Sequence, residues 1–426
     1  MLELHHDIIK EKLYFKTLNN GLSVYLMPRD NFSKAYGIFA SNYGSIDSKF
    51  KDPDNNEIVK VPDGIAHFLE HKLFEGENED TFSIFARLGA STNAYTNQNT
   101  TAYLFQSSEN IIEASTALLN FVQEPYFTDE NVEKEKGIIE QEIRMYEDDA
   151  NYQVYFNLLS AMYHKHPAKI DIAGTVESIA KISKEDLYLC YNTFYNPGNM
   201  VLFITGDFVV EDMMKIIEEN QNKKQFKNYE EIERFYEDEP QNVYENLVQK
   251  NMDVSQALFR MGIKENIIPK DPIEMLKQDI ASNILMDILI GKGSSLYQEL
   301  YNDGLIDNSF GHYYVLEKGY GYALLGGKSN DPELLYNSLK EVFLNNKKNI
   351  KEDDFKRLLK KNIGEYVEGF NSFDNIASDF ISFHFKGLNY FDYLKIMEDI
   401  NYEYILKRSK DLFQEEHICR SIIERA

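Results

Sequence analysis

An acidic, polar stretch near the middle of the chain constrains the fold more than any other feature. Residues 221–245 include the run EEIERFYEDEP and show no sustained apolar periodicity. The stretch divides 426 residues into halves of similar length, and a chain this long exceeds one ordinary hydrophobic core. We therefore predict two domains, residues 1–220 and 246–426, joined by a solvated acidic linker at 221–245.

The first half has the pattern of an α+β domain. Short alternating or apolar runs predict strands, and longer runs that begin at capping residues predict helices. A helix is expected from Gly64 to about Phe74, with Asp63 as its N-cap. The other expected elements are strands at 21–27, 34–41 and 199–205, a hairpin within 91–106, and helices at 109–121, 129–147 and 152–163.

The second half repeats this order. We predict a strand near 254–263, a helix near 273–290, a hairpin near 308–328 and then further helices. The repetition suggests an internal duplication, although the two halves share little sequence identity.

Composition narrows the class of protein. The formal charge of −25 opposes nucleic-acid binding, which needs a cationic face. Two cysteines cannot form a disulfide framework and fit a reducing compartment. The N-terminal residues lack the pattern of a secretory signal, and no apolar run reaches the roughly 20 residues that cross a bilayer. We expect a cytoplasmic protein that binds neither nucleic acid nor membrane.

The motif His67-Phe-Leu-Glu70-His71 predicts a metal site. On a helix, side chains four residues apart lie on one face, so His67 and His71 can hold one ion. Zinc suits imidazole ligands, although manganese or cobalt could also occupy such a site. Glu70 can act as the general base that takes a proton from water and passes it to a leaving amine.

A catalytic zinc needs a third protein ligand, and the helix at 129–147 offers several glutamates. Glu135 and Glu142 are two turns apart and share an otherwise apolar stripe with Val132 and Ile139. A carboxylate on an apolar stripe is costly unless it is paired or bound to metal. We predict Glu142 as the third ligand and Glu135 as the residue that orients a ligating histidine or the water.

Four motifs resemble the insulinase/pitrilysin family of metallopeptidases, which includes the mitochondrial processing peptidases. They are GIAHFLEHKLFEG, ASTNAYTNQNTTAYLFQ, EKEKGIIEQEIRMYEDD and IAGTVESIAKISKEDLYLCYNTFYNPGNMVLFITGDF, within residues 20–208. The resemblance implies two related α+β domains, each a mainly antiparallel sheet covered by helices. It implies zinc on His67, His71 and Glu142, with Glu70 as base. It also implies that Asn93, Ala94 and Tyr95 lie on an edge strand that pairs with an extended substrate peptide.

One departure from the family concerns the second domain. Active members commonly carry an Arg and a Tyr there, whereas the corresponding run SSLYQELYNDGLIDNSFGHYYV has tyrosines but no Arg. No Arg occurs between Arg260 and Arg357, and a lysine such as Lys318 cannot replace the planar guanidinium. We therefore predict a heterodimer, in which a related subunit without H-x-x-E-H supplies the Arg/Tyr half. A homodimer is the alternative assembly.

These observations predict a zinc metalloendopeptidase that cleaves short or unfolded peptides in a chamber between two domains. Two alternatives remain open from the sequence. The chain could be a non-catalytic, peptide-binding subunit that keeps zinc for structure, although an intact Glu70 argues against that. It could also be a dedicated maturation peptidase for one precursor peptide.

Overall fold

The computed structural model describes residues 1–6, 8–77 and 79–426, and the chain forms two compact units. Unit 1 contains residues 1–143, 171–236 and 369–385, and unit 2 contains residues 144–170, 237–368 and 386–426. These units cut the chain at other positions than the predicted 1–220, 221–245 and 246–426. Two helical segments, 144–170 and 369–385, each join the unit built mainly from the other half of the chain.

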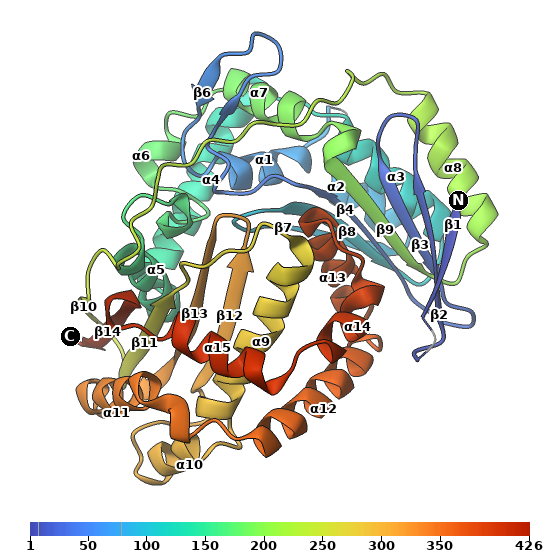
Figure 1. The fold of residues 1–426 in the computed structure, drawn as a ribbon. Helices are drawn as coiled ribbons and strands as arrows, with labels where there is room; N and C mark the ends of the chain where they lie inside the picture. The colour runs from blue at the N-terminus through green and yellow to red at the C-terminus, as the bar shows by residue number, and fades with distance from the viewer. Residues whose placement is uncertain (7, 78) are drawn as a thin grey trace. The chain divides into compact units, whose positions relative to one another are not determined.

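Unit 1 is built on a seven-stranded sheet in the order β1-β2-β3-β9-β4-β8-β7 (Figure 1). All neighbouring pairs are antiparallel except β3 and β9. The strands are β1 (Leu2–His6), β2 (Glu11–Thr17), β3 (Ser23–Pro28), β4 (Ala35–Ser41), β7 (Ala90–Thr96), β8 (Thr101–Ser107) and β9 (Met200–Gly206), and a separate pair is β5 (Lys49–Lys51) with β6 (Ile58–Lys60).

Helices cover one face of this sheet and bury its core. Alternate residues such as Val24, Phe39 and Leu202 point into this core, as strand periodicity requires. The helices of the unit are α1 (Ile65–Leu73), α2 (Thr81–Arg87), α3 (Ile111–Gln123), α4 (Asp129–Asp148), α6 (Val176–Ile179), α7 (Lys184–Phe194), α8 (Val210–Asn222) and α13 (Phe373–Lys386), with α4 crossing into unit 2.

Helix α13 contacts the opposite face of the same sheet. The ring of Phe380 stacks on Phe203 with a centroid distance of 5.0 Å, and the Tyr25 hydroxyl lies 3.0 Å from Nδ1 of His384. These contacts explain why residues 369–385 belong to unit 1, because their apolar side chains pack on the second face of its sheet.

Unit 2 is built on a five-stranded sheet in the order β10-β14-β11-β13-β12 (Figure 1). The strands are β10 (Leu247–Met252), β11 (Ala257–Lys264), β12 (Gly311–Glu317), β13 (Tyr320–Ser329) and β14 (Ile418–Arg425). The helices are α5 (Ala150–Met162), α9 (Pro272–Ile290), α10 (Ser295–Asn302), α11 (Pro332–Leu344), α12 (Glu352–Gly369), α14 (Tyr393–Glu398) and α15 (Tyr402–Leu412). Val154 of α5 packs on Leu258 and Ile423, which places α5 against β11 and β14.

The two sheets share one topology. Numbered in chain order, the strands β3, β4, β7, β8 and β9 lie in the order 1-5-2-4-3, and so do β10 to β14. In both sheets the first and fifth strands form the one parallel pair. The predicted fold class, α+β with two related and mainly antiparallel domains, is confirmed.

The segment predicted as a solvated linker forms ion pairs and hydrogen bonds with both units. In unit 1, Nε of Arg234 lies 2.9 Å from Oδ1 of Asp47, which is buried. In unit 2, Glu239 accepts a hydrogen bond of 2.6 Å from Nζ of Lys264 and three more from backbone N–H groups of residues 164–166. The acidic residues of this segment therefore include specific structural partners as well as solvated side chains.

Candidate metal centre

Helix α1 presents the histidine motif, and its start depends on a glycine. The N-cap is Gly64 at φ 91°, so the prediction of Asp63 as N-cap is wrong. A Cβ on Gly64 would lie 2.3 Å from the carbonyl oxygen of Ala173. Only glycine combines this left-handed backbone with so close an approach. In the helix that follows, Phe68 and Leu69 are buried in the core, and His67 and His71 lie on the other side, facing Glu142.

The structure brings the three predicted ligands together within unit 1. Nε2 of His67 lies 3.7 Å from one carboxylate oxygen of Glu142, and Nε2 of His71 lies 3.5 Å from the other. Among the described residues, these three form the one group of His, Cys, Asp or Glu side chains whose potential ligand atoms all lie within 4.8 Å of one another. Bonds of about 2.1 Å in a tetrahedron separate the ligand atoms by about 3.4 Å, so the spacing fits a zinc ion.

Glu135 holds His71 in the orientation that metal binding needs. Oε1 of Glu135 lies 3.1 Å from Nδ1 of His71. A carboxylate can only accept, so Nδ1 carries the hydrogen, and in the neutral ring Nε2 is the nitrogen with the lone pair, on the side of Glu142. The other oxygen of Glu135 lies 3.5 Å from Nζ of Lys72, a fully buried lysine that also bonds Glu75.

The electrostatics of the two histidines differ. Burial lowers the pKa of His67 to about 3, and the neighbouring His71 lowers it as well, so this ring is neutral. For His71, burial also acts to lower the pKa, but the bond to Glu135 and the charge of Glu70 raise it overall. Nδ1 of His67 is buried and has no hydrogen-bond partner among the described residues.

Glu70 stands beside the three ligands and is held by the edge strand β7. The Thr96 hydroxyl donates a hydrogen bond of 2.6 Å to Oε2 of Glu70. Burial raises the pKa of Glu70, and this hydrogen bond acts in the opposite direction. A carboxylate with a raised pKa is suited to take up a proton near neutral pH.

Thr96 and Lys72 are site residues that sequence reasoning missed. Thr96 had a detectable signal, because the two-residue period of β7 puts it on the same face as Ala94, which packs on the helix-covered core. Lys72 had no such signal in the sequence, because its burial depends on a helix that lies more than 60 residues later in the chain.

Strand β7 is an edge strand that pairs only with β8 among the described strands. Asn93 is exposed, and its side-chain oxygen accepts a hydrogen bond of 2.9 Å from the Ala94 N–H. Burial raises the pKa of the Tyr95 hydroxyl. The structure thus places the three predicted substrate-binding residues along an open sheet edge.

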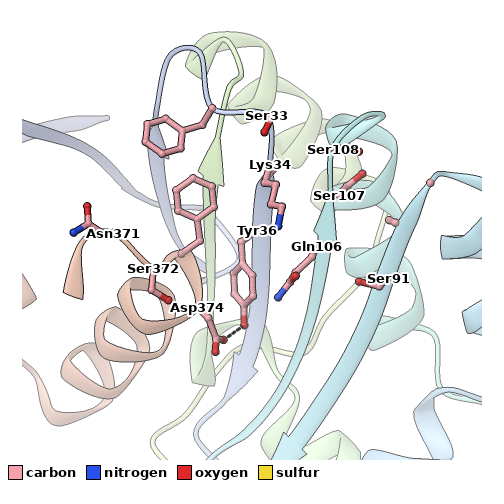
Figure 2. A pocket seen from close by; sticks show the side chains of 15 residues that line it. Ser33, Lys34, Tyr36, Ser91, Gln106, Ser107, Ser108, Asn371, Ser372 and Asp374 are labelled. Carbon is pink, nitrogen blue, oxygen red and sulfur yellow. Dashed lines mark hydrogen bonds between the residues drawn. The ribbon is translucent and has the colours of Figure 1, made fainter. Parts of the chain in front are cut away.

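A groove of about 680 Å³ opens at the beginning of β7, away from the metal ligands. Figure 2 shows Ser91 and Gln106 on neighbouring strands and the Tyr36 hydroxyl turned toward Asp374, to which it donates a 2.6 Å hydrogen bond. Ser91 precedes Thr96 by five residues, or about 17 Å at the usual strand rise. The edge between them is long enough for several residues of an extended chain.

Comparisons with known proteins identify the family. Residues 55–176 match the model described as insulinase (peptidase family M16), and residues 181–362 match the one described as peptidase M16 inactive domain. A Bacillus subtilis (strain 168) protein named "uncharacterized zinc protease YmfH" is 41% identical over 400 residues, 94% of each chain. The chain belongs to the M16 family.

Other relatives agree with this M16 assignment. The crystal structure of an M16-like peptidase from Alicyclobacillus acidocaldarius has a TM-score of 0.94 and 38% identity, covering 98% of this chain and 99% of that one. The β subunit of the mitochondrial-processing peptidase of Caenorhabditis elegans is 30% identical over 209 residues, 47% of this chain and 43% of that one. The predicted resemblance to the insulinase family is confirmed. None of the described helices has the length and apolarity to cross a membrane.

Proposed function

We propose that this M16 chain is a zinc-dependent endopeptidase that hydrolyses short or unfolded peptides. The observation that carries the proposal is the convergence of His67, His71 and Glu142 beside a buried Glu70. Names of relatives, such as zinc protease for YmfH, support zinc as the metal.

His67, His71 and Glu142 would hold the ion, and Glu135 would keep His71 in its ligating tautomer. Zinc, when bound, supplies Lewis acidity that allows water to lose a proton near neutral pH. Glu70 then accepts the proton of the attacking water and returns it to the leaving amine. Thr96 fixes one oxygen of Glu70 and leaves the other oxygen available for that transfer.

The open edge at Asn93–Tyr95 favours an extended peptide as substrate. An added strand would satisfy backbone groups of β7 by β-augmentation, and this mode requires an unfolded segment. The groove beyond Ser91 gives room for residues away from the scissile bond. A segment that pairs along this edge must be able to extend, so short or unfolded peptides are the expected class.

We also propose that full activity requires a related partner subunit. The run from Ser294 to Val315 lacks the Arg of the family's Arg/Tyr pair. A relative whose name describes it as a subunit supports such an assembly. A purified chain that cleaves peptides by itself as fast as the mixture with its partner would contradict this part of the proposal.

Metal analysis combined with a peptide-library digest tests the proposed function. The purified chain should contain one zinc ion, lose activity when a chelator removes it and regain activity when zinc is returned. The digest is run with and without the partner. Absence of cleavage under both conditions, with zinc bound, would favour a non-catalytic subunit. Cleavage of a single precursor alone would favour a maturation peptidase.

A further inference from the structure

Arg260 on strand β11 of unit 2 has no acidic partner among the residues that the structure describes. Six other arginines of the chain each lie within 4.0 Å of a carboxylate. Arg260 is partly buried, forms no ion pair with any described residue, and donates one hydrogen bond, of 3.1 Å, to the Phe259 carbonyl. A guanidinium has five N–H donors, so most of those of Arg260 have no partner among the described residues and can bind a ligand. A partly desolvated cation is costly unless it is paired. A chain with a net charge of −25 has many carboxylates, yet none of the described ones pairs with Arg260.

Two glycines lie beside this arginine on the face of the sheet. We call the strip of backbone surface that they leave without side chains of their own the lane. Arg260 is in register with Gly326 on β13, and Gly326 is in register with Gly311 on the edge strand β12. A Cβ on Gly326 would lie 3.0 Å from Cδ of Arg260, so the arginine side chain lies over this glycine. Gly311 has nothing within 4 Å of an added Cβ. The lane therefore runs from Arg260 over Gly326 on β13 to Gly311 on β12. Strand β12 is the edge strand of this sheet in Figure 1.

Tyrosine hydroxyls border the lane. Tyr313, two residues after Gly311 on the same face of β12, is 42% exposed. Its ring lies 6.4 Å from that of Tyr322, and the Tyr322 hydroxyl lies 2.8 Å from that of Tyr155. Phenolic hydroxyls can donate to an anion held by the arginine. Burial lowers the pKa of Arg260, with Tyr313 acting in the opposite direction, and an anion in the lane would offset the same desolvation.

Strand β12 is the counterpart of β7 in the shared topology, since each is the third strand in chain order and lies at an edge. We propose that Arg260 binds a carboxylate of the peptide substrate, either its C-terminus or an acidic side chain, in the lane that ends at β12. The proposal rests on the proposed function for the identity of the ligand as a peptide. Arg260 is a substrate-binding residue in this account, and the proton transfers remain with Glu70.

Binding to a chain that cannot turn over substrate tests this site. Glu70→Gln serves as the background, alone and combined with R260Q, R260K or the matched control R425Q, which removes an exposed arginine at the end of β14. Three fluorescent peptides share one sequence without acidic residues: a free C-terminal acid, a C-terminal amide, and an amide with one internal Glu. Fluorescence anisotropy gives each Kd, and thermal unfolding checks that every variant is folded.

The background chain and R425Q should bind at least one carboxylate peptide about tenfold more tightly than the neutral amide. R260Q should lose this preference, and R260K should keep only part of it because an ammonium lacks the planar fork. The peptide that shows the preference identifies which carboxylate is bound. Equal Kd values for all three peptides on the background chain, or a preference that survives both Arg260 substitutions, would overturn the proposal. Cleavage of the neutral amide by the wild-type chain tests the peptidase function separately.

Discussion

The two units share a strand order but use the corresponding helix differently. In unit 1, α1 follows the second common strand and carries His67, Glu70 and His71. In unit 2, α9 occupies the same place in chain order and buries apolar residues along most of its length. The shared topology is therefore a scaffold, and the chemistry of each unit depends on a few side chains placed on it.

The two units also differ in how the chain pairs their buried charged side chains. In unit 2, Glu265 is paired with Arg408 and also accepts a 2.7 Å hydrogen bond from Tyr314, so its charge is satisfied by the chain itself. In unit 1, the imidazoles of His67 and His71 face Glu142 at distances too long for hydrogen bonds. The unit 2 cluster is complete, whereas in our proposal a metal ion completes the unit 1 cluster.

The largest expected effect comes from Glu70→Gln. The amide cannot accept the proton of water, so cleavage of a test peptide should fall by at least 10²–10⁴-fold. Zinc content and unfolding temperature should stay at the wild-type values, because Glu70 is not a proposed ligand. Unchanged activity would show that Glu70 is not the general base, so that this residue would not distinguish the chemistry of unit 1 from that of unit 2.

Replacing the third ligand should remove the metal together with the activity. Glu142→Gln should bind substoichiometric zinc after dialysis, as measured by elemental analysis. Glu147→Gln is the matched control, since Glu147 is exposed on the same helix. If Glu142→Gln retained one tightly bound zinc ion, Glu142 could not be a ligand.

Glu135→Gln tests the residue that orients His71. Removing the charged acceptor of Nδ1 should weaken zinc binding about 10–100-fold, which a competition titration with a chelator measures. Glu133→Gln, whose side chain is 70% exposed, should leave the affinity at the wild-type value. Equal affinities for both variants would reduce Glu135 to a structural partner of Lys72.

Unit 2 offers the smallest effect, on stability alone. Burial raises the pKa of Asp279 to about 6, against the lowering effect of Lys386. The folded state therefore holds this proton more tightly than the unfolded state, and stability from this group is lost as pH rises from about 4 to about 6. Asp279→Asn should remove this fall and increase the free energy of unfolding at pH 7 by roughly 1–2 kcal/mol, which is less than the full pKa difference would give because Asp279 is partly exposed. Urea unfolding across that pH range measures it, and a parallel pH profile of the two proteins would contradict the assignment.

The sequence predicted the parts of the molecule that depend on local pattern. The helix with His67 and His71 and the stripe that includes Glu142 follow from helical periodicity, and strand β9 follows from a short apolar run. Its internal duplication was also visible, and the identical strand order of the two sheets supports it.

Features that depend on tertiary pairing were beyond sequence reasoning. The apolar faces of α5 and α13 predict burial, but they do not say against which sheet each helix packs. The surroundings of Arg260 depend on the register that aligns it with Gly326 and Gly311, and register is set between strands far apart in the chain.

An anomalous-scattering map at the zinc edge, from a crystal of the zinc-loaded chain, tests whether the three proposed ligands bind one ion. We expect one strong peak about 2.0–2.2 Å from Nε2 of His67, Nε2 of His71 and a carboxylate oxygen of Glu142. A map without a peak at these three side chains, or with zinc bound elsewhere and Glu142 turned away, would contradict this expectation.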